Sequence, residues 1–316
     1  MLKMLIFVDA IVALDPCEVA GLEQKMHILL CVHGALSAAL SQLRFSSPSR
    51  LPSAQVARIQ REIASLLSAK DDEATQAISG TMSQIWGCLM ESMDASIRIQ
   101  KIQTPHGSSD VHNVTRAATD HFGYLWDNYS SVTPIVFQAA CRGYAAEVGD
   151  TKHPLASLTI QMMPCLEEKL DRWSKSFPDQ GLRFLFMMNN YCYILQQLHD
   201  HNTHARNLLH LYFAQLSRKI KSHELRYPEV SWAPVLSCLR YRGSSPLPKF
   251  ERTFCKTYNA QKLWKVPDPE LRERLRKAIT KKIVSGYTNY IKDNGVTTLK
   301  FSPQELQEML RELFEG

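Results

Sequence analysis

Basic side chains recur at helical spacing near the C-terminal end of the chain. In the stretch LRERLRKAITKKIVSGYTNYIK, residues 271–292, a projection at about 100° per residue places Arg274, Lys277, Lys281 and Lys292 on one side of a helix, and Lys300 follows. A row of guanidinium and ammonium groups binds anions, so these residues predict docking on a phosphate-bearing surface rather than catalysis. A helix with a merely solvated face has the same pattern, and the spacing alone does not separate the two interpretations.

The flanking sequence adds to the positive charge. Between Arg240 and Lys300 there are fifteen Lys or Arg against five Asp or Glu, whereas the whole chain carries a net charge of only +6. Such a local excess is typical of a site for a membrane surface or nucleic acid. Nucleic acid is the less favoured partner, because zinc-finger, RNA-recognition and glycine-rich phosphate-loop patterns are missing and aromatic residues are not interleaved with the basic ones. Anionic lipid is favoured, since each cation near it contributes about 1 kcal/mol.

Other residue types that could do chemistry are less convincing. His199, His201, His204 and His210 are close in sequence but lack an HExxH pattern or a nearby cysteine ligand, so we predict a loop between helices and no metal. Nucleophile-elbow, phosphate-loop and kinase patterns are missing, and the adjacent Glu167 and Glu168 would point to different sides of a helix. The sequence therefore predicts a protein that is not an enzyme and needs no cofactor.

Cysteine usage and the N-terminal segment indicate the compartment. The eight cysteines show no CxxC pair or recurring spacing, which predicts reduced, mostly buried thiols in the cytosol. Asp9 interrupts the opening apolar run MLKMLIFVDAIVAL, so we do not expect a secretory signal. No stretch has the roughly 18 uninterrupted apolar residues typical of a transmembrane helix.

The elements that must position the basic residues are helices. Apolar residues recur at intervals of three and four along nearly every segment, and alternating runs joined by hairpin turns are lacking, which predicts an all-α chain. Clusters of Pro, Gly and Ser divide the chain into about a dozen helices. These predicted breaks are 45–53, 104–110, 148–154, 176–181, 226–231, 242–248 and 293–303.

Two helix starts have a clear local cause. Asp268 precedes Pro269 and Glu270, so an N-cap, a first-turn proline and a first-turn acid coincide. Ser302 precedes Pro303, and Glu305 lies at the third helical position, which predicts a capping box. We therefore expect one helix to begin after Asp268 and the last helix to begin after Ser302.

Several segments of the chain match the pattern of a known family. They are LRFLFMMNNYCYILQQL (182–198) with its paired Asn189 and Asn190, SWAPVLSCL (231–239), FERTFCKTYNAQKLW (250–264), LWKVPDPELRERLRKAI (263–279), YTNYIKDN (287–294) and LKFSPQELQEMLRELFEG (299–316). In these segments the chain resembles the Exo-seventy subunit family of the exocyst vesicle-tethering complex, and the closing LFEG resembles its plant members. Weaker similarity extends through VHNVTRAATDHFGYLWDNY (111–129) to the N-terminus.

The resemblance implies a fold and a domain organisation. Family members are elongated rods of stacked antiparallel helical bundles, of the tethering-complex type, and are roughly twice as long as this chain. On this basis we expect a remnant of an upstream bundle at 1–50, a middle bundle at 51–204 and a basic C-terminal bundle at 205–316. The chain is then expected to lack the N-terminal rod of the family.

The resemblance also implies a function. An exocyst subunit of this kind tethers secretory vesicles to the plasma membrane during exocytosis, as a cytoplasmic protein that binds peripherally to phosphatidylinositol bisphosphate, other exocyst subunits and Rho-type small GTPases. The alternative is a shortened helical interaction module in plant immunity or autophagy, which binds a GTPase, an immune protein or a pathogen effector without tethering.

Two of the family's basic positions are not basic in this chain. A pair of basic residues three apart before the last helix corresponds to Thr297 and Lys300, and another position aligns near Ser244. Lipid binding is therefore either weaker here or moved onto the preceding helix and Lys249. We predict lipid contacts at Arg274, Lys277, Lys281, Lys292 and Lys300.

Overall fold

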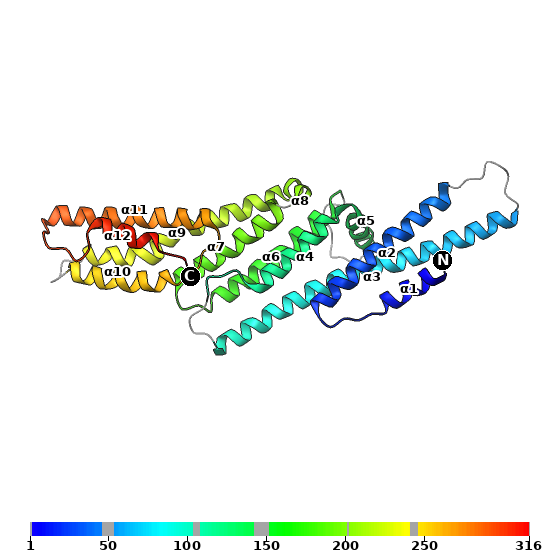
Figure 1. The fold of residues 1–316 in the computed structure, drawn as a ribbon, viewed down its shortest axis with the longest axis horizontal. Coiled ribbons are helices and arrows are strands. Elements are labelled where there is room, and N and C mark those ends of the chain that lie inside the picture. The colour runs from blue at the N-terminus through cyan, green and yellow to red at the C-terminus, as the bar shows by residue number, and fades with distance from the viewer. Residues whose placement is uncertain are drawn as a thin grey trace. The chain divides into compact units, whose positions relative to one another are not determined.

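A computed structural model describes residues 2–45, 54–103, 108–141, 152–200, 202–240 and 246–315. This part of the chain is built of helices and contains no β-strand, which confirms the predicted all-α class (Figure 1). The helices are α1 (Leu2–Val12), α2 (Val19–Phe45), α3 (Ala54–Gln103), α4 (Asn113–Asp127), α5 (Tyr129–Cys141), α6 (Pro154–Ser174), α7 (Gln180–Leu195), a π-helical turn (Gln196–Asp200), α8 (Thr203–Leu208), α9 (His210–Arg240), α10 (Pro246–Lys262), α11 (Pro269–Asn294) and α12 (Pro303–Arg311).

The helices form two compact units. The first unit contains Met1–Asp94, Ala117–Pro164 and Asn202–Leu208, and the second contains Ala95–Arg116, Cys165–His201 and Leu209–Gly316. Each unit therefore combines segments that are distant in sequence. The division into three consecutive bundles at 1–50, 51–204 and 205–316 stays a prediction.

In the first unit, α1 packs on α2. Their shared core includes Val8 of α1 and Leu36 of α2, both fully buried. The ammonium group of Lys25 donates to the carbonyl oxygens of Val12, at 3.1 Å, and Leu14. Since the last carbonyls of a helix have no partner within the helix, Lys25 stabilises the end of α1.

One described helix is long and apolar enough to cross a membrane. This segment, Val19–Leu43 of α2, meets the criterion by length and composition alone, and a core helix meets the same criterion. Within the first unit its Val32, Leu36 and Leu40 belong to the apolar core. The segment is therefore only weak support for a membrane span.

In the second unit, α7, α10 and α11 pack on α9. Helix α9 runs unbroken from His210 to Arg240, so the break predicted at 226–231 is wrong. Proline at position 228 removes one helical hydrogen bond, but the residues around it are buried: Tyr227 and Trp232 both donate to the side-chain oxygen of Gln261 in α10, at 2.7 and 2.8 Å. Burial on both sides of the proline favours the continuous helix over the local turn signal.

The predicted helix starts of the second unit are confirmed. The carboxylate of Asp268 accepts from the Leu271 backbone N–H as the N-cap of α11, and Ser302 and Glu305 form the expected capping box at α12. Gly295 ends α11 with φ of 60°, a left-handed conformation that glycine adopts without a steric penalty. The connection 295–302 thereby turns the chain back onto α11.

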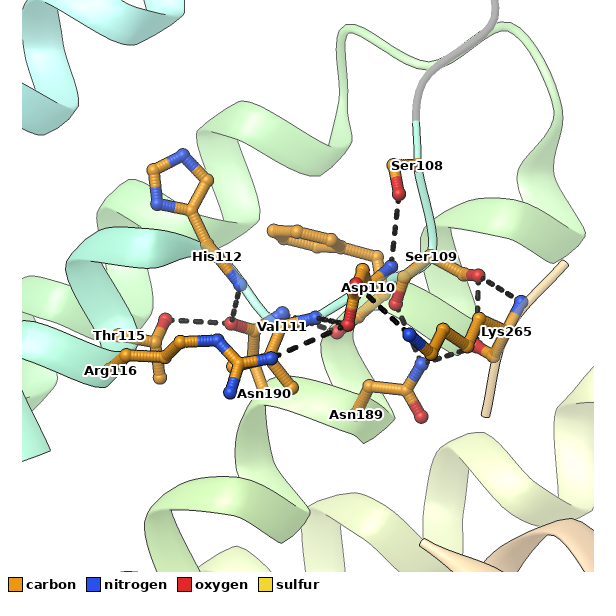
Figure 2. A network of polar contacts seen from close by, with 11 residues as sticks. Ser108, Ser109, Asp110, Val111, His112, Thr115, Arg116, Asn189, Asn190 and Lys265 are labelled. Atoms are coloured by element: carbon orange, nitrogen blue, oxygen red, sulfur yellow. Dashed lines mark hydrogen bonds and ion pairs between the residues drawn. The ribbon is translucent and has the colours of Figure 1, made fainter. Parts of the chain in front are cut away.

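Two adjacent asparagines of α7 organise the second unit (Figure 2). The amide nitrogen of Asn189 donates to the carbonyl oxygens of Ser109 and Lys265, at 2.6 and 2.8 Å. Ser109 and Lys265 are also joined directly, since the serine hydroxyl donates to Lys265 O and accepts from Lys265 N, at 2.9 and 2.7 Å. Asn189 thus links the segment before α4 to the connection between α10 and α11.

The second asparagine acts on the start of α4. The side-chain oxygen of Asn190 accepts from the backbone N–H of His112 and from the hydroxyl of Thr115, at 3.0 and 2.6 Å. Its amide nitrogen donates to the carbonyl oxygen of Phe186. Both asparagines are almost completely buried, where an unpaired carboxamide is costly, so these contacts fix residues 112–115, the part of the α4 start that belongs to the second unit, against α7.

Replacing Asp268 by alanine is expected to lower the free energy of unfolding by about 1 kcal/mol, because α11 loses its N-cap acceptor. Asp268→Asn keeps an acceptor oxygen and should lose less than half as much. Urea unfolding followed by circular dichroism measures both variants. Equal stability of Asp268→Ala and the parent would contradict the capping role.

Stability should also fall at low pH. Burial lowers the pKa of His112 from 6.5 to about 4, and burial shifts His121 the same way. The unfolded chain therefore binds a proton near pH 6.5 and the folded chain only near pH 4, so the stabilising contribution is complete above pH 6.5 and is lost as the pH falls toward 4. As the pH falls from 7 to 4.5, protonation of His112 in the unfolded chain should lower the free energy of unfolding by about 2 kcal/mol.

The variant His112→Asn tests this pH dependence. Asparagine can still accept the hydrogen bond that the backbone N–H of Val114 donates to His112 Nδ1, but it does not titrate in this range. The variant should therefore lose less stability than the parent between pH 7 and 4.5, whatever its stability at pH 7. Equal losses for both chains would contradict the assigned cause.

Candidate functional site

The candidate site is the outer side of α11. Its buried residues recur at intervals of four and form the face toward the other helices: Leu271, Leu275, Ile279, Ile283 and Tyr287. Tyr290, which the helical projection places on this face, is only half-buried. The predicted cations Arg274, Lys277, Lys281 and Lys292 are exposed on the opposite side, so they share one side of the helix as the projection predicts.

One flank of α11 is used to hold the end of the chain. Arg276 donates to the carbonyl oxygen of Leu313 and forms an ion pair with Glu315, and Arg272 lies 3.5 Å from the same carboxylate. Hydrogen bonding from Arg276, with the charges of Arg272 and Arg276, lowers the pKa of Glu315. Phe314 between them is fully buried with φ of 67°. These two arginines therefore have a structural role.

The five predicted lipid contacts differ in their partners. Arg274 Nε lies 3.4 Å from Glu224 Oε1, a carboxylate with a side-chain exposure of 9%. Lys277 lies 3.4 Å from Glu273 on the same helix, where both side chains are more than half exposed. Arg274 therefore compensates a buried charge, whereas the exposed pair of Lys277 contributes little.

The other three cations are available to a ligand. Within the described part of the chain, Lys281 and Lys292 have no ion pair with an acidic side chain, and both are exposed. Lys300 lies over the ring of Phe301, 5.4 Å from its centre, and also remains exposed. Lys281, Lys292 and Lys300 are named the distal lysines below.

The five cations do not form one compact cluster. Eighteen residues separate Arg274 from Lys292, which corresponds to about 27 Å along a helix. Lys292 lies in the last turn of α11 and Lys300 in the connection to α12, at the end of the second unit where α9 ends and α10 begins (Figure 1). Arg240 and Arg252 lie at this end too and are exposed. The positive charge is therefore concentrated where α11 ends.

Sequence reasoning missed the structural role of Arg274, because its partner Glu224 lies 50 positions earlier. A signal was present: Glu224 falls in the helical spacing of Leu216, Ile220 and Tyr227, all of which are buried. An acid at a core position needs a cation, and Arg274 supplies it. Thr297 is exposed in the α11–α12 connection, and Ser244 lies outside the described residues.

The remaining sequence predictions concern histidines and cysteines. The predicted loop at 199–210 is instead largely helical, because a π-helical turn and α8 fill most of it. His199 packs edge-on against Phe213 and His204 stacks on Tyr129, while His201 lies outside the described residues. No cluster of three metal-ligating side chains occurs in the described ranges. All eight cysteines are free, but only Cys192 and Cys238 are buried, so the prediction of mostly buried thiols is wrong.

Known proteins share these sequence and fold features. Residues 24–312 match the family model for the C-terminal part of Exo70, a component of the exocyst complex. Among curated Arabidopsis thaliana proteins, exocyst complex component EXO70A1 is 26% identical over 277 residues, and the match covers 77% of this chain and 41% of the relative. Exocyst complex component EXO70A3 of the same plant is 29% identical over 249 residues, and the match covers 71% of this chain and 41% of the relative. The chain therefore spans about two fifths of the length of these relatives.

The fold has solved counterparts in yeast. The crystal structure of the S. cerevisiae exocyst component Exo70p aligns with a TM-score of 0.56 at 12% identity, covering 94% of this chain and 62% of that one. A second structure of S. cerevisiae Exo70 aligns with a TM-score of 0.58 at 13% identity, covering 94% and 60%. At this identity the likeness establishes the helical-bundle fold.

Arg274 and Lys281 should differ in their effect on stability. Among the described residues, Arg274→Ala leaves the buried carboxylate of Glu224 with Lys221 as its one cation, 3.3 Å away and largely exposed, so we expect a loss of about 2 kcal/mol. Lys281→Ala should change the free energy of unfolding by less than about 0.5 kcal/mol. Urea unfolding of the two variants in parallel measures the difference. If both variants are as stable as the parent, the structural role of Arg274 is wrong.

Proposed function

Since the chain belongs to the Exo70 family of exocyst subunits, we propose that it acts in exocytosis as an exocyst-type subunit that tethers secretory vesicles to the plasma membrane. In this proposal the basic end of the second unit docks on phosphoinositide lipid. The observation that carries it is the set of distal lysines, which are exposed and lack acidic partners among the described residues.

The physical basis is electrostatic attraction to a surface. Three lysines near anionic lipid supply about 3 kcal/mol, enough for weak and reversible docking. Phosphatidylinositol bisphosphate carries several phosphate charges, so its headgroup attracts an ammonium group more strongly than a singly charged lipid does. Screening by salt weakens such contacts between exposed charges. The proposed contact is therefore peripheral, salt-sensitive and independent of a deep pocket.

The five predicted cations have unequal parts in this proposal. The distal lysines are the principal lipid contacts, and Lys277 adds to the potential along α11 because its pair with Glu273 is exposed. Arg274 contributes mainly to the bundle through Glu224. The phosphoinositide contact thus lies at the end of α11 and in the α11–α12 connection.

The proposed partners follow from the family. The curated relatives are exocyst complex components, so we infer that this chain also contacts other exocyst subunits, with a Rho-type small GTPase as a further partner. The proposed location is the cytoplasm, with peripheral association at the plasma membrane. The proposal includes no enzymatic activity, cofactor or nucleic-acid partner. The alternative of an immune or autophagy module that does not tether has no specific observation in its favour.

Vesicle flotation tests the lipid contact. The triple variant Lys281→Glu, Lys292→Glu, Lys300→Glu should lose at least tenfold in the fraction bound to vesicles with phosphatidylinositol bisphosphate, because attraction becomes repulsion. The parent should also dissociate as salt rises from 0.1 to 0.5 M.

A matched control separates this surface from net charge. The variant Arg58→Glu, Arg61→Glu, Arg98→Glu makes the same change in net charge at exposed positions of α3. It should float like the parent. The proposal fails if the distal variant floats as well as the parent, or if the control variant loses as much binding as the distal one.

A further inference from the structure

Two adjoining hollows lie in the first unit among α3, α4, α5 and α6. A water molecule can enter about 200 Å³ of the outer one and about 40 Å³ of the inner one, and both are lined by Ser79, Ser83 and Ala139. The two overlap, so they form one site that begins at the surface and continues inward. A cavity of about 150 Å³ can bind benzene, so the site has room for a molecule of that size.

Small side chains create the space. Ser79 and Ser83 are one helical turn apart on α3, Gly80 lies beside them, and Ala139 faces them from α5. The hydroxyl of Ser83 donates to the backbone carbonyl of Ser79, so it is satisfied by its own helix. A side chain added at Gly80 would meet no atom within 4 Å. The space beside Gly80 is thus not filled by a side chain of the described residues.

The inner part is mostly apolar, and beyond the shared Ser79 and Ser83 it has one further polar group among the described residues. Its walls are Met82, Leu125, Val136, Leu158 and Met162. The polar group is His121, which is 2% exposed and makes no hydrogen bond with the described residues, and its Nδ1 is completely enclosed. A buried imidazole without a partner is costly, and a ligand in this cavity that hydrogen-bonds to the ring reduces this cost.

The cavity is electrically neutral, which favours an uncharged ligand. Burial lowers the pKa of His121 to about 4, so the ring is neutral at pH 7. Among the described residues, the side chains that line the two hollows include no Asp, Glu, Lys or Arg. A carboxylate or ammonium group would enter without a countercharge, which is unfavourable in an apolar site. The site therefore favours a neutral, mostly apolar molecule.

We propose that this cavity binds a small uncharged alcohol, with its apolar body between α3 and α6 and its hydroxyl group hydrogen-bonded to His121. A hydroxyl group fits better than a carbonyl, because it both donates and accepts and so pairs with either tautomer of the ring. The cavity lies in a different unit from the basic surface, so ligand binding there is independent of membrane docking.

The test uses the full chain with methyl-labelled methionine and three probes of similar shape: benzyl alcohol, toluene and benzoate. The NMR signals of Met82 and Met162, which line the cavity, should shift with saturable dependence on benzyl alcohol. The neighbouring Met163, fully buried but outside the lining, is the internal control. Toluene should bind about fivefold more weakly, because it lacks the hydrogen bond, and benzoate at least tenfold more weakly.

Three variants locate the site. His121→Phe should reduce the affinity for benzyl alcohol to that for toluene, and Ser79→Leu should abolish both by filling the cavity. Ser65→Leu, at an exposed position of the same helix, should leave both unchanged. The ligand series on the parent chain is decisive even if a variant does not fold. Equal affinity for benzoate and benzyl alcohol, unsaturable shifts at Met82 and Met162, or an equal shift at Met163 would overturn the proposal.

Discussion

The second unit depends on two buried carboxamides. Asn189 and Asn190 lie on α7, a helix whose side chains are buried along most of its length, and they reach in sequence to segments about 75 to 80 residues away. The two carbonyl oxygens bound by Asn189 fix the orientation of its amide group, because only the NH₂ end can donate to both. The cost is an unpartnered Asn189 Oδ1 inside the core. The same side chain joins the segment before α4 to the connection that leads into α11, which offsets this cost.

The contacts of Asn189 also help to determine which side of α11 faces outward. Lys265 is held by Ser109 and Asn189, and Asp268, three residues later, caps α11 and accepts from Gln196 in the turn after α7. The helix therefore begins at a fixed point. Its core face is then fixed by packing on α9, and Arg272 and Arg276 are used to hold the C-terminal residues. The side of α11 that is left exposed carries the row of cations that ends at Lys292.

Local and distant causes explain which features could be predicted from the sequence. The starts after Asp268 and Ser302 depend on residues within four positions, so the pattern contains all the information needed. The unbroken α9 depends on Gln261, which is distant in sequence from the buried Trp232 that it binds. The structural role of Arg274 depends on Glu224, which is also distant in sequence from Arg274. The paired asparagines were noticeable only through the family resemblance, since their partners Ser109 and Lys265 follow no local spacing. The cavity beside His121 needed four helices to be placed together.

We propose that the chain docks on lipid at the end of α11, and hydrogen exchange tests this proposal most directly. Exchange is measured by mass spectrometry on the chain alone and with vesicles that contain phosphatidylinositol bisphosphate. The account predicts slower exchange in residues 292–302 when vesicles are present, with no change in α3. Unchanged exchange at 292–302, or protection that is confined to the first unit, would contradict it.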